Sequence, residues 1–397
     1  MRIAYIAHYF SPSDCAAAII DQTIVQGLVD RGHELLVFCP QTFSKYTHQH
    51  MLQDENQDYP FEVYHSFPTP LPLSIIVPHI FNALKASKHR YDLIITQFHL
   101  FHLASYTGLL SKTLGKPWVV KVHDIIFDPT LSIPVSEKAF INSCYRLFVR
   151  ASYGLFLRDV GKKADKLLVL TRELQNLLQA YGYPPDKIVV SPNGVDTKLF
   201  SPPASKRGCS DKKTLLYIGS MMPQYGLSNL IKAFSLLNQE KQLSLTLIGD
   251  GSERLKLIEL AKKLDLEQKV IFYRHIPYKL IPQFIRESYI GIGPLRLSPI
   301  NNYTIPTKII EYFACGKPVV SSPVSKDILI DKSTGFVVKD VSPRNIAEKL
   351  SFMIEDEKLT HDMGKKARQL VVERFDWEKI IDQIEKEIRT LEPHRIS

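Results

Sequence analysis

Short apolar segments alternate with helix-length segments along the chain, and this alternation starts twice. Short apolar strands that are separated by helices are typical of a parallel sheet with helices on both faces. The first set predicts strands at Arg2–Ala7, Leu35–Cys39, Leu93–Thr96, Trp118–Val122, Lys166–Leu170 and Lys187–Val190, with helices at Ala16–Arg31 and Leu100–Leu114. The second set predicts strands at Thr214–Ile218, Leu243–Ile248, Val270–Tyr273, Ile290–Ile292 and Pro318–Ser321, with helices at Ser228–Leu237, Ser252–Leu264, Lys279–Glu287 and Thr307–Cys315. We therefore predict an α/β protein with two doubly wound, Rossmann-like domains.

The length of 397 residues also favours two domains, because one hydrophobic core rarely serves so long a chain. We place the first domain at 1–195 and the second at 196–376, with the hinge in Asn193–Lys213, which is rich in Pro, Ser, Lys and Asp. A last charged helix, Trp377–Leu391, packs back on the first domain or caps the second. Ligands of doubly wound sheets bind beyond the carboxyl ends of the strands, so we expect the chemistry in a cleft between the two domains.

The composition is ordinary for a globular protein, with 45% hydrophobic and 23% charged residues. No apolar run is long enough to span a membrane, and the N-terminus reads as a first strand rather than a signal peptide. The five cysteines are scattered, which fits neither a disulfide framework nor a zinc site and favours a reducing cytoplasm. The net charge of +9 favours anionic partners such as nucleic acids, membranes or phosphate-bearing ligands, without choosing among them.

The run YTIPTKIIEYFACGKPVVSS, at 303–322, carries the strongest chemical signal. Its helix is mostly apolar, yet Glu311 lies in the middle and Lys308 one turn before it. A carboxylate in this position can accept hydrogen bonds from the vicinal hydroxyls of a ribose. The helix N-terminus at Thr307 and the Lys308 ammonium can hold phosphate. The alternative is that Glu311 is a solvent-facing residue of an ordinary amphipathic helix, and periodicity alone does not decide between the two.

The run PTKIIEYFACGKPVV resembles the signature of glycosyltransferase family 4, in the branch that reads Pro-Ser-Lys-x-x-Glu-Tyr. Other segments match the same family in the same order, namely MRIAYIAHYFSP, LVDRGHELLVF, VVKVHD, VVSPNGVDTKLFSP, LLYIGSM, LTLIGDGSERL and VIFYRHIPY. The resemblance implies a GT-B fold, with the nucleotide-sugar donor on the second domain and the acceptor on the first. It also implies transfer with retention at the anomeric carbon, without a metal or other cofactor, and it gives Glu311 the role of binding the donor ribose.

The chain departs from the family pattern at two places in the expected donor site. Many members carry a further Glu where this chain has Tyr303, and the neighbouring polar residues are candidates to contact the sugar instead: Asn301, Asn302, Tyr303 and Thr304. Many members also have Gly-Arg and Lys-Gly where this chain has Gly219-Ser220 and Tyr225-Gly226. Charge builds on the departing diphosphate in the transition state, so another cation must balance it. Lys308 is the first candidate and Arg296 the second, although Arg296 also reads as an ordinary surface charge.

Further donor-site candidates follow the strands of the second domain. Gly219 has no Cβ and lets the backbone approach a phosphate, although it also reads as a plain turn at a strand end. Gly249 opens a glycine-rich turn that does not complete a dinucleotide fingerprint. The resemblance places Arg274 and His275 near the nucleotide base, with Arg274 where a Gly is usual.

In the first domain, His123 ends the strand VVKV and is the main candidate. The resemblance places it near the donor phosphate and sugar, where a neutral imidazole can form a hydrogen bond. A histidine at a strand end is otherwise often only packed. The loop that contains Asp14, Cys15 and Ala16 replaces a frequent Gly-Gly of the family and is expected on the acceptor side. No Asp-x-Asp pair is present, which agrees with a site without a metal.

The segment 136–166 alternates aromatic residues with Lys and Arg. Such a segment can lie in an anionic membrane interface, or it can pack its aromatic residues on the first domain and expose its charges. We favour the membrane, and we expect no nucleic acid partner because no recognition module is present.

The sequence therefore predicts a cytoplasmic, peripheral-membrane glycosyltransferase of polysaccharide biosynthesis that is retaining and independent of metal. It is expected to transfer a sugar from a nucleotide-sugar to a cell-surface glycan or a lipid-linked acceptor. The departures described above leave two alternatives open. One is a nucleotide-sugar epimerase of the same fold, and the other is an inactive scaffold that binds a glycan or a membrane.

Overall fold

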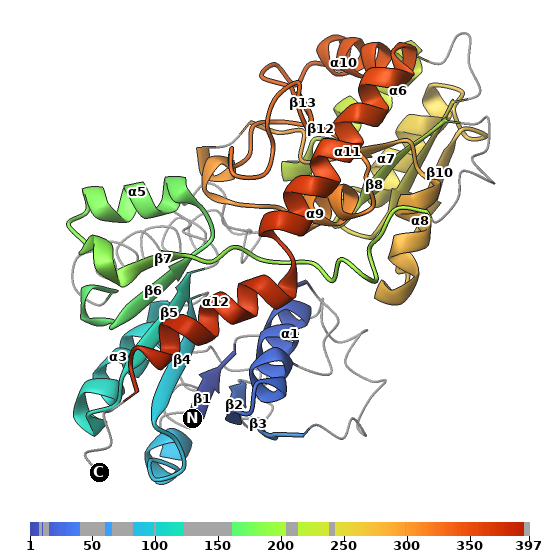
Figure 1. The fold of residues 1–397 in the computed structure, drawn as a ribbon. Helices are drawn as coiled ribbons and strands as arrows, with labels where there is room; N and C mark the ends of the chain where they lie inside the picture. Colours follow the sequence, from blue (N-terminus) through green and yellow to red (C-terminus); the bar gives the residue numbers. More distant parts are fainter. Residues whose placement is uncertain are drawn as a thin grey trace. The chain divides into compact units, whose positions relative to one another are not determined.

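The computed structural model divides the chain into two compact units, Met1–Pro192 with Glu378–Ser397, and Asn193–Trp377 (Figure 1). The structure describes residues 1–7, 10, 16–39, 60–65, 82–98, 101–122, 161–203, 213–237, 243–297 and 299–392. The boundary between the two units lies at 192/193, and the sequence predicts it at 195/196. Each unit has its own parallel sheet and its own core.

The first unit is built on a sheet of seven described strands in the order β3-β2-β1-β4-β5-β6-β7, and every neighbouring pair is parallel. The chain starts in the middle of this sheet, adds strands toward one edge, and then adds strands on the other side of β1. The two strands at this reversal, β1 and β4, are therefore neighbours. The strands are β1 (Arg2–Ile6), β2 (Glu34–Cys39), β3 (Glu62–His65), β4 (Leu93–Phe98), β5 (Trp118–Val122), β6 (Lys166–Val169) and β7 (Ile188–Val190).

The described helices of the first unit include α12 (Trp377–Arg389), which belongs to this unit from Glu378 onward, whereas its first residue, Trp377, belongs to the second unit. The isoleucines of α12 recur every three or four residues and are buried, at Ile380, Ile381, Ile384 and Ile388. Arg31 follows α1 and forms ion pairs with α12, at 2.9 Å to Glu378 and 2.5 Å to Asp382. The other helices are α1 (Ala16–Asp30), α3 (Phe101–Leu114) and α5 (Arg172–Ala180).

The second unit repeats the same winding with six described strands, in the order β10-β9-β8-β11-β12-β13. All of its neighbouring pairs are parallel, and β8 and β11 are the strands at the reversal. The strands are β8 (Lys213–Ile218), β9 (Leu243–Ile248), β10 (Val270–Tyr273), β11 (Ile290–Ile292), β12 (Val319–Ser321) and β13 (Gly335–Val337). The helices are α6 (Leu227–Leu237), α7 (Arg254–Lys263), α8 (Ile281–Glu287), α9 (Thr307–Ala314), α10 (Pro343–Glu355) and α11 (Glu357–Arg374). The prediction of two doubly wound α/β units is confirmed.

Several bounds and elements differ from the sequence prediction. The helix expected from Lys279 begins at Ile281, because Tyr278–Leu280 form a separate 3-10 turn and Pro282 lies in the first turn of α8. The helix expected from Ser252 begins at Arg254, after the turn at Gly251, whose φ is 154°. The sequence prediction did not include these elements: β3, α5, β13, α10 and α11.

Candidate functional site

The loops that follow β8 and β9 are joined at the carboxyl edge of the second sheet. The amide of Gly219 donates to the carbonyl of Ile248 at 2.9 Å, and that of Gly249 donates to the carbonyl of Tyr273 at 3.0 Å. A Cβ built on Gly249 would lie 2.0 Å from the carbonyl oxygen of Gly219, so no other residue fits there without moving the loop. The two glycine loops are thus held against each other where ligands of such sheets bind.

Helix α9 is fixed to this edge by Tyr312. β11 pairs with β8 only at Leu215 and Leu216, which leaves the end of β8 without a strand neighbour on that side. The Tyr312 hydroxyl donates to the carbonyl of Leu216 at 3.1 Å and accepts from the amide of Ile218 at 2.9 Å. It therefore takes the place of a neighbouring strand and holds α9 against the end of β8, one of the two strands at the reversal of the sheet.

Glu311 is buried on α9, with 9% of its surface exposed. The alternative of a solvent-facing residue on an ordinary amphipathic helix is therefore wrong. Its Oε1 accepts a hydrogen bond from the hydroxyl of Tyr278 at 3.1 Å. Burial raises the pKa of Glu311 from 4.5 to about 7, against the opposing effects of the Tyr278 hydrogen bond and the nearby Lys308 ammonium. The side chain is thus a buried acceptor held by one donor.

Lys308 is partly buried one turn before Glu311, on the same side of the helix. Its ammonium lies 4.0 Å from the ring centre of Tyr217 and 4.8 Å from that of Tyr225. A Cβ built on Gly219 would lie 2.6 Å from Nζ, so the missing side chain of Gly219 leaves room for the ammonium. Burial lowers the pKa of Lys308 from 10.5 to about 7, although the Glu311 carboxylate opposes this change.

The other predicted donor residues lie around these groups or at the surface. Ser220 is exposed, and its carbonyl accepts the hydroxyl of Tyr217 at 2.7 Å. Arg274 is 71% exposed and forms a loose ion pair with Asp250 at 3.8 Å, while the neighbouring His275 is also exposed. Asn302 is exposed, and Tyr303, Thr304 and Thr307, the first residue of α9, are partly buried. These residues flank α9 or follow β8 and β10, at the edge that carries the two glycine loops.

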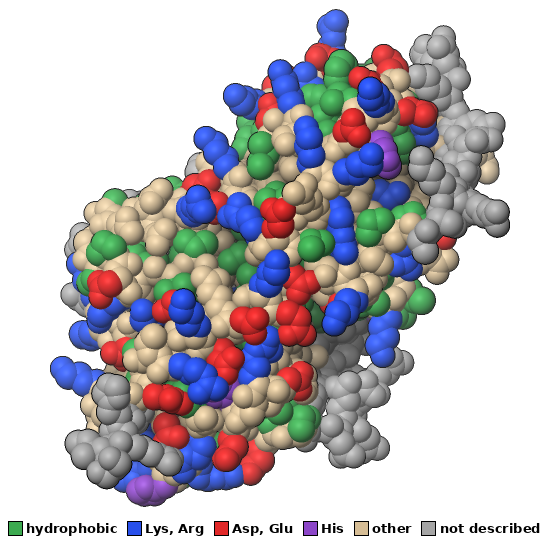
Figure 2. Space-filling model, viewed as in Figure 1, with side chains coloured by type: hydrophobic (Ala, Val, Ile, Leu, Met, Phe, Trp, Pro, Cys, Tyr) green, Lys and Arg blue, Asp and Glu red, His purple; other side chains and the backbone are tan. Residues whose placement is uncertain are grey.

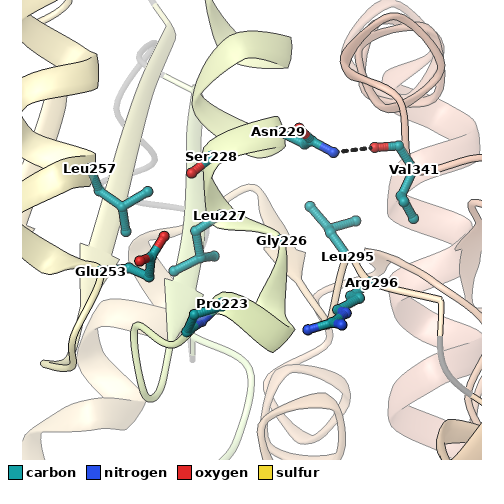
Figure 3. A pocket seen from close by; sticks show the side chains of 10 residues that line it. All are labelled: Pro223, Gly226, Leu227, Ser228, Asn229, Glu253, Leu257, Leu295, Arg296 and Val341. Atoms are coloured by element: carbon teal, nitrogen blue, oxygen red, sulfur yellow. Dashed lines mark hydrogen bonds between the residues drawn. The ribbon is translucent and has the colours of Figure 1, made fainter. Parts of the chain in front are cut away.

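Arg296 lines a cavity of ≈ 250 Å³ (Figure 3), and neither Lys308 nor Glu311 is among the residues that line it. Leu257 and Glu253 stand on one side of the cavity, and Leu295 and Arg296 stand on the other. At its far end the amide of Asn229 donates to the carbonyl of Val341 at 2.9 Å. The role of Arg296 at the diphosphate therefore stays a prediction.

A second group of polar side chains is buried at the carboxyl edge of the first sheet, and the sequence prediction missed it. Tyr5, Gln97 and Lys121 are each the last but one residue of β1, β4 and β5, so the register places them on one face. The Tyr5 hydroxyl donates to Asp21 of α1 at 2.9 Å and accepts from Gln97 Nε2 at 2.7 Å.

Within the described part of the chain, three atoms of this group have no hydrogen-bond partner, namely Asp21 Oδ2, Gln97 Oε1 and Lys121 Nζ. Burial raises the pKa of Asp21 well above 3.8 and lowers that of Lys121 from 10.5 to about 8. The sequence feature that could have indicated this buried polar group is Lys121, a lysine inside the apolar run WVVKV.

Several predicted residues lie outside the described part of the chain, namely His123, Asp14, Cys15 and most of the basic segment 136–166. Ala16 is the exposed first residue of α1. On the face shown in Figure 2, Lys and Arg side chains lie among Asp and Glu rather than in one basic patch. Within the described ranges, no three His, Cys, Asp or Glu side chains are grouped to hold a metal ion, and no helix is long and apolar enough to cross a membrane.

Two family models match the chain in succession. Residues 22–199 match Glycosyltransferase Family 4, and residues 204–370 match Glycosyl transferases group 1. The first match lies almost wholly within the first unit, and the second lies within the second unit.

Individual proteins show the same similarity over most of the chain. An uncharacterised glycosyltransferase of Methanocaldococcus jannaschii is 23% identical over 374 residues, which is 90% of this chain and 90% of the relative. The Campylobacter jejuni N-acetylgalactosamine-N,N'-diacetylbacillosaminyl-diphospho-undecaprenol 4-alpha-N-acetylgalactosaminyltransferase is 24% identical, over 76% of this chain and 79% of the relative. Among solved structures, Anabaena HepE in complex with UDP matches with a TM-score of 0.72 at 21% identity, over 98% of this chain and all of HepE.

Proposed function

Because the chain is a GT-B glycosyltransferase of the group 1, family 4-like kind, we propose that it is a retaining, metal-independent enzyme that uses a nucleotide-sugar donor. We further propose a cell-surface glycan or a lipid-linked oligosaccharide as the acceptor. The observation that carries the donor proposal is the placement of Glu311 and Lys308, one turn apart on α9, at the carboxyl edge of the second sheet. HepE, which shares the fold, was solved in complex with UDP.

In this proposal Glu311 accepts hydrogen bonds from the vicinal hydroxyls of the donor ribose. Tyr278 already donates to one of its oxygens, which fixes the carboxyl while leaving its other acceptor positions for the ligand. Burial makes an ionised carboxylate costly, and two hydroxyl donors compensate that cost. The ribose hydroxyls and the ionised form of Glu311 therefore stabilise each other.

The diphosphate is assigned to Lys308 and to the glycine loops beside it. The ammonium lies next to Gly219, where no side chain separates a phosphate from the backbone. Negative charge grows on the diphosphate as the bond to the sugar breaks, and a fixed ammonium stabilises that charge in the transition state. The predicted sugar-side residues, Asn302 to Thr304, directly precede α9.

The reaction we propose is front-face attack. The acceptor hydroxyl oxygen forms a bond to the anomeric carbon on the face from which the diphosphate leaves. The bond from that carbon to the phosphate oxygen breaks, and the acceptor proton passes to the departing phosphate oxygen. Glu311 is engaged by the ribose and does not act as a nucleophile, so a trapped glycosyl-enzyme adduct would contradict this sequence. The chain contributes positioning and charge, which are the main sources of rate in such a step.

The acceptor proposal is supported by the Campylobacter jejuni relative, whose name describes transfer to a saccharide on diphospho-undecaprenol. The basic aromatic segment 136–166 supports an anionic membrane surface as a partner, because Lys and Arg side chains near such a surface are attracted to its lipids. We therefore propose that the enzyme acts at the inner face of the cell membrane.

The donor proposal is tested by titrating UDP, GDP, ADP and TDP into the wild type, Glu311→Gln and the control Glu259→Gln, which changes an exposed carboxylate of α7. One nucleotide is expected to bind the wild type and the control equally. Glu311→Gln is expected to weaken it by about 1.5–3 kcal/mol, or roughly 10- to 150-fold, for the loss of a charged hydrogen-bond acceptor. A folded wild type that binds none of the four would overturn the proposal.

A further inference from the structure

The Lys308 ammonium lies in a corner made by two tyrosine rings. The ring centres of Tyr217 and Tyr225 are 6.3 Å apart, with 55° between the ring planes. Tyr217 is fully buried at the end of β8, and its hydroxyl is fixed by the carbonyl of Ser220. Tyr225 is partly buried in the 3-10 turn Pro223–Tyr225. The ammonium approaches both rings within the range of cation–π attraction.

The fold otherwise opposes a positive charge at this place. Lys308 is the second residue of α9, and the N-terminus of a helix carries partial positive charge, which disfavours a cation. Burial also disfavours the ammonium, as its lowered pKa indicates. The charge of the Glu311 carboxylate raises the pKa of Lys308, but in the proposed function this carboxylate accepts the hydrogen bonds of the ribose. The rings therefore stabilise a cation that has little other compensation until an anion binds.

We propose that Tyr225, together with Tyr217, positions the Lys308 ammonium beside Gly219 so that it binds the diphosphate of the donor. Tyr225 is then a positioning residue that acts through Lys308, and its aromatic ring carries this role rather than its hydroxyl. The inference rests on the proposed function, because it assigns the charge that holds the phosphates of the same donor. It extends that function because it names the two tyrosine rings as the groups that hold the Lys308 ammonium in place, where the site would otherwise need a second cation at the diphosphate.

The test separates the diphosphate from the nucleoside. The dissociation constants of UDP and of uridine are measured by calorimetry at pH 7, and their ratio reports the contribution of the diphosphate. The pair is changed to the matching diphosphate and nucleoside if the four-nucleotide titration selects another base. The proteins are the wild type, Lys308→Met, Tyr225→Leu and the conservative Tyr225→Phe.

The wild type is expected to bind UDP more tightly than uridine. Lys308→Met is expected to remove most of this preference, and Tyr225→Leu to reduce it about three- to tenfold, as the loss of one partly desolvated cation–π contact implies. Tyr225→Phe keeps the ring and is expected to keep the ratio. The affinity for uridine is expected to stay within about twofold in the wild type and the two Tyr225 variants, which a general disruption of the fold would not allow. Lys308→Met also removes a charge that lowers the pKa of Glu311, so its affinity for uridine is expected to fall, and the ratio of UDP to uridine affinity separates this effect from the loss at the diphosphate.

Two results would overturn the inference while leaving the proposed transfer reaction and the ribose contact of Glu311 intact. One is an unchanged ratio in Lys308→Met, with UDP still weakened by Glu311→Gln, which would mean that other groups hold the diphosphate. The other is a loss in Tyr225→Phe equal to that in Tyr225→Leu, which would assign the role to the hydroxyl. If Tyr225→Leu does not fold, Tyr225→Met takes its place. A wild type that binds no nucleoside diphosphate would overturn the proposed function itself.

Discussion

Replacing Lys121 by Met is expected to raise the free energy of unfolding of the first unit by about 3 kcal/mol at pH 7. Lys121 is 1% exposed, and its ammonium has no hydrogen-bond partner among the residues that the structure describes. Burial lowers its pKa from 10.5 to about 8, although the Asp21 carboxylate opposes the change. At 1.36 kcal/mol for each pKa unit, holding the charged lysine costs about 3 kcal/mol more in the folded than in the unfolded chain. Met fills a similar volume without a charge and removes that cost.

The variant also leaves Asp21 without a positive neighbour, which by itself would be destabilising. Burial already raises the pKa of Asp21 well above 3.8, so the carboxyl takes up a proton instead of staying as an isolated buried charge. The hydrogen bond from the Tyr5 hydroxyl can persist to the neutral carboxyl.

The pH dependence tests the physical cause. Below about pH 8 the lysine is charged in both states, so the full cost is present in the wild type. Between about pH 8 and pH 10.5 the unfolded chain keeps a proton that the folded chain releases, so the wild type gains stability with rising pH. The gain approaches about 1.4 kcal/mol per pH unit, and Lys121→Met lacks it. The stability difference between the two proteins is therefore expected to disappear near pH 10.5.

The assay is guanidinium unfolding of the full chain, followed by the fluorescence of Trp118 in β5. The chain has two tryptophans, so both proteins carry Trp377→Phe, which leaves the signal of the first unit alone. Lys112→Met, which changes an exposed lysine of α3, is the matched control and is expected to shift stability by less than about 0.5 kcal/mol. The reasoning is refuted if Lys121→Met is less stable at pH 7, or if the stability difference stays constant between pH 8 and pH 10.5.

Three further predictions concern the second unit. Tyr312→Phe removes both hydrogen bonds to the end of β8 and is expected to lower the free energy of unfolding by about 1–3 kcal/mol. The measurement is unfolding followed by Trp377 fluorescence, and an unchanged stability would contradict the prediction. Gly249→Ala forces a Cβ against the Gly219 carbonyl and is expected to weaken UDP about tenfold or more in calorimetry, whereas unchanged binding would show that the loop can move freely. Affinity for UDP is expected to be highest near pH 7, because Glu311 gains a proton below about pH 7 and Lys308 loses one above it. Titrations between pH 5.5 and pH 8.5 test this, and Glu311→Gln is expected to remove only the acid side.

The two sheets are predictable from the sequence because strands buried on both faces appear as apolar runs. Every residue of β9, with the sequence LSLTLI, is buried. The elements that the prediction did not include are not marked by apolar runs of this kind. β3 has four residues and, among the described strands, it lies at the edge of the sheet and pairs only with β2. The helix α11 has buried residues but is rich in charges along its length, so its apolar side is weakly marked in the sequence.

The candidate site is predictable only where one residue contrasts with its own segment. Glu311 stands out because a carboxylate interrupts the apolar run IIEYF, and Lys308 because it is a charged residue in the first turn of the same helix. Tyr278, which donates to Glu311, lies 33 residues away in the chain, and nothing in its own segment indicates the contact. Tyr225 is similar, because a tyrosine in a turn reads as an ordinary core residue. Such contacts depend on which strands become neighbours in the sheet. The periodicity of a single segment predicts a strand or a helix, but it does not predict the neighbours of that segment.

Both units place buried or partly buried polar groups at the same topological position. In each sheet the winding reverses between the first and the fourth strand of the unit, β1 and β4 or β8 and β11. Lys308 and Glu311 lie beside the second reversal, and Lys121 and Asp21 lie beside the first. Burial lowers the pKa of both lysines, so neither is retained for the stability of its own unit. For Lys308 the proposed diphosphate supplies the missing compensation. A gain in stability in Lys121→Met would show that the first unit also holds a charge at this position against its own stability, which is a common mark of a functional position.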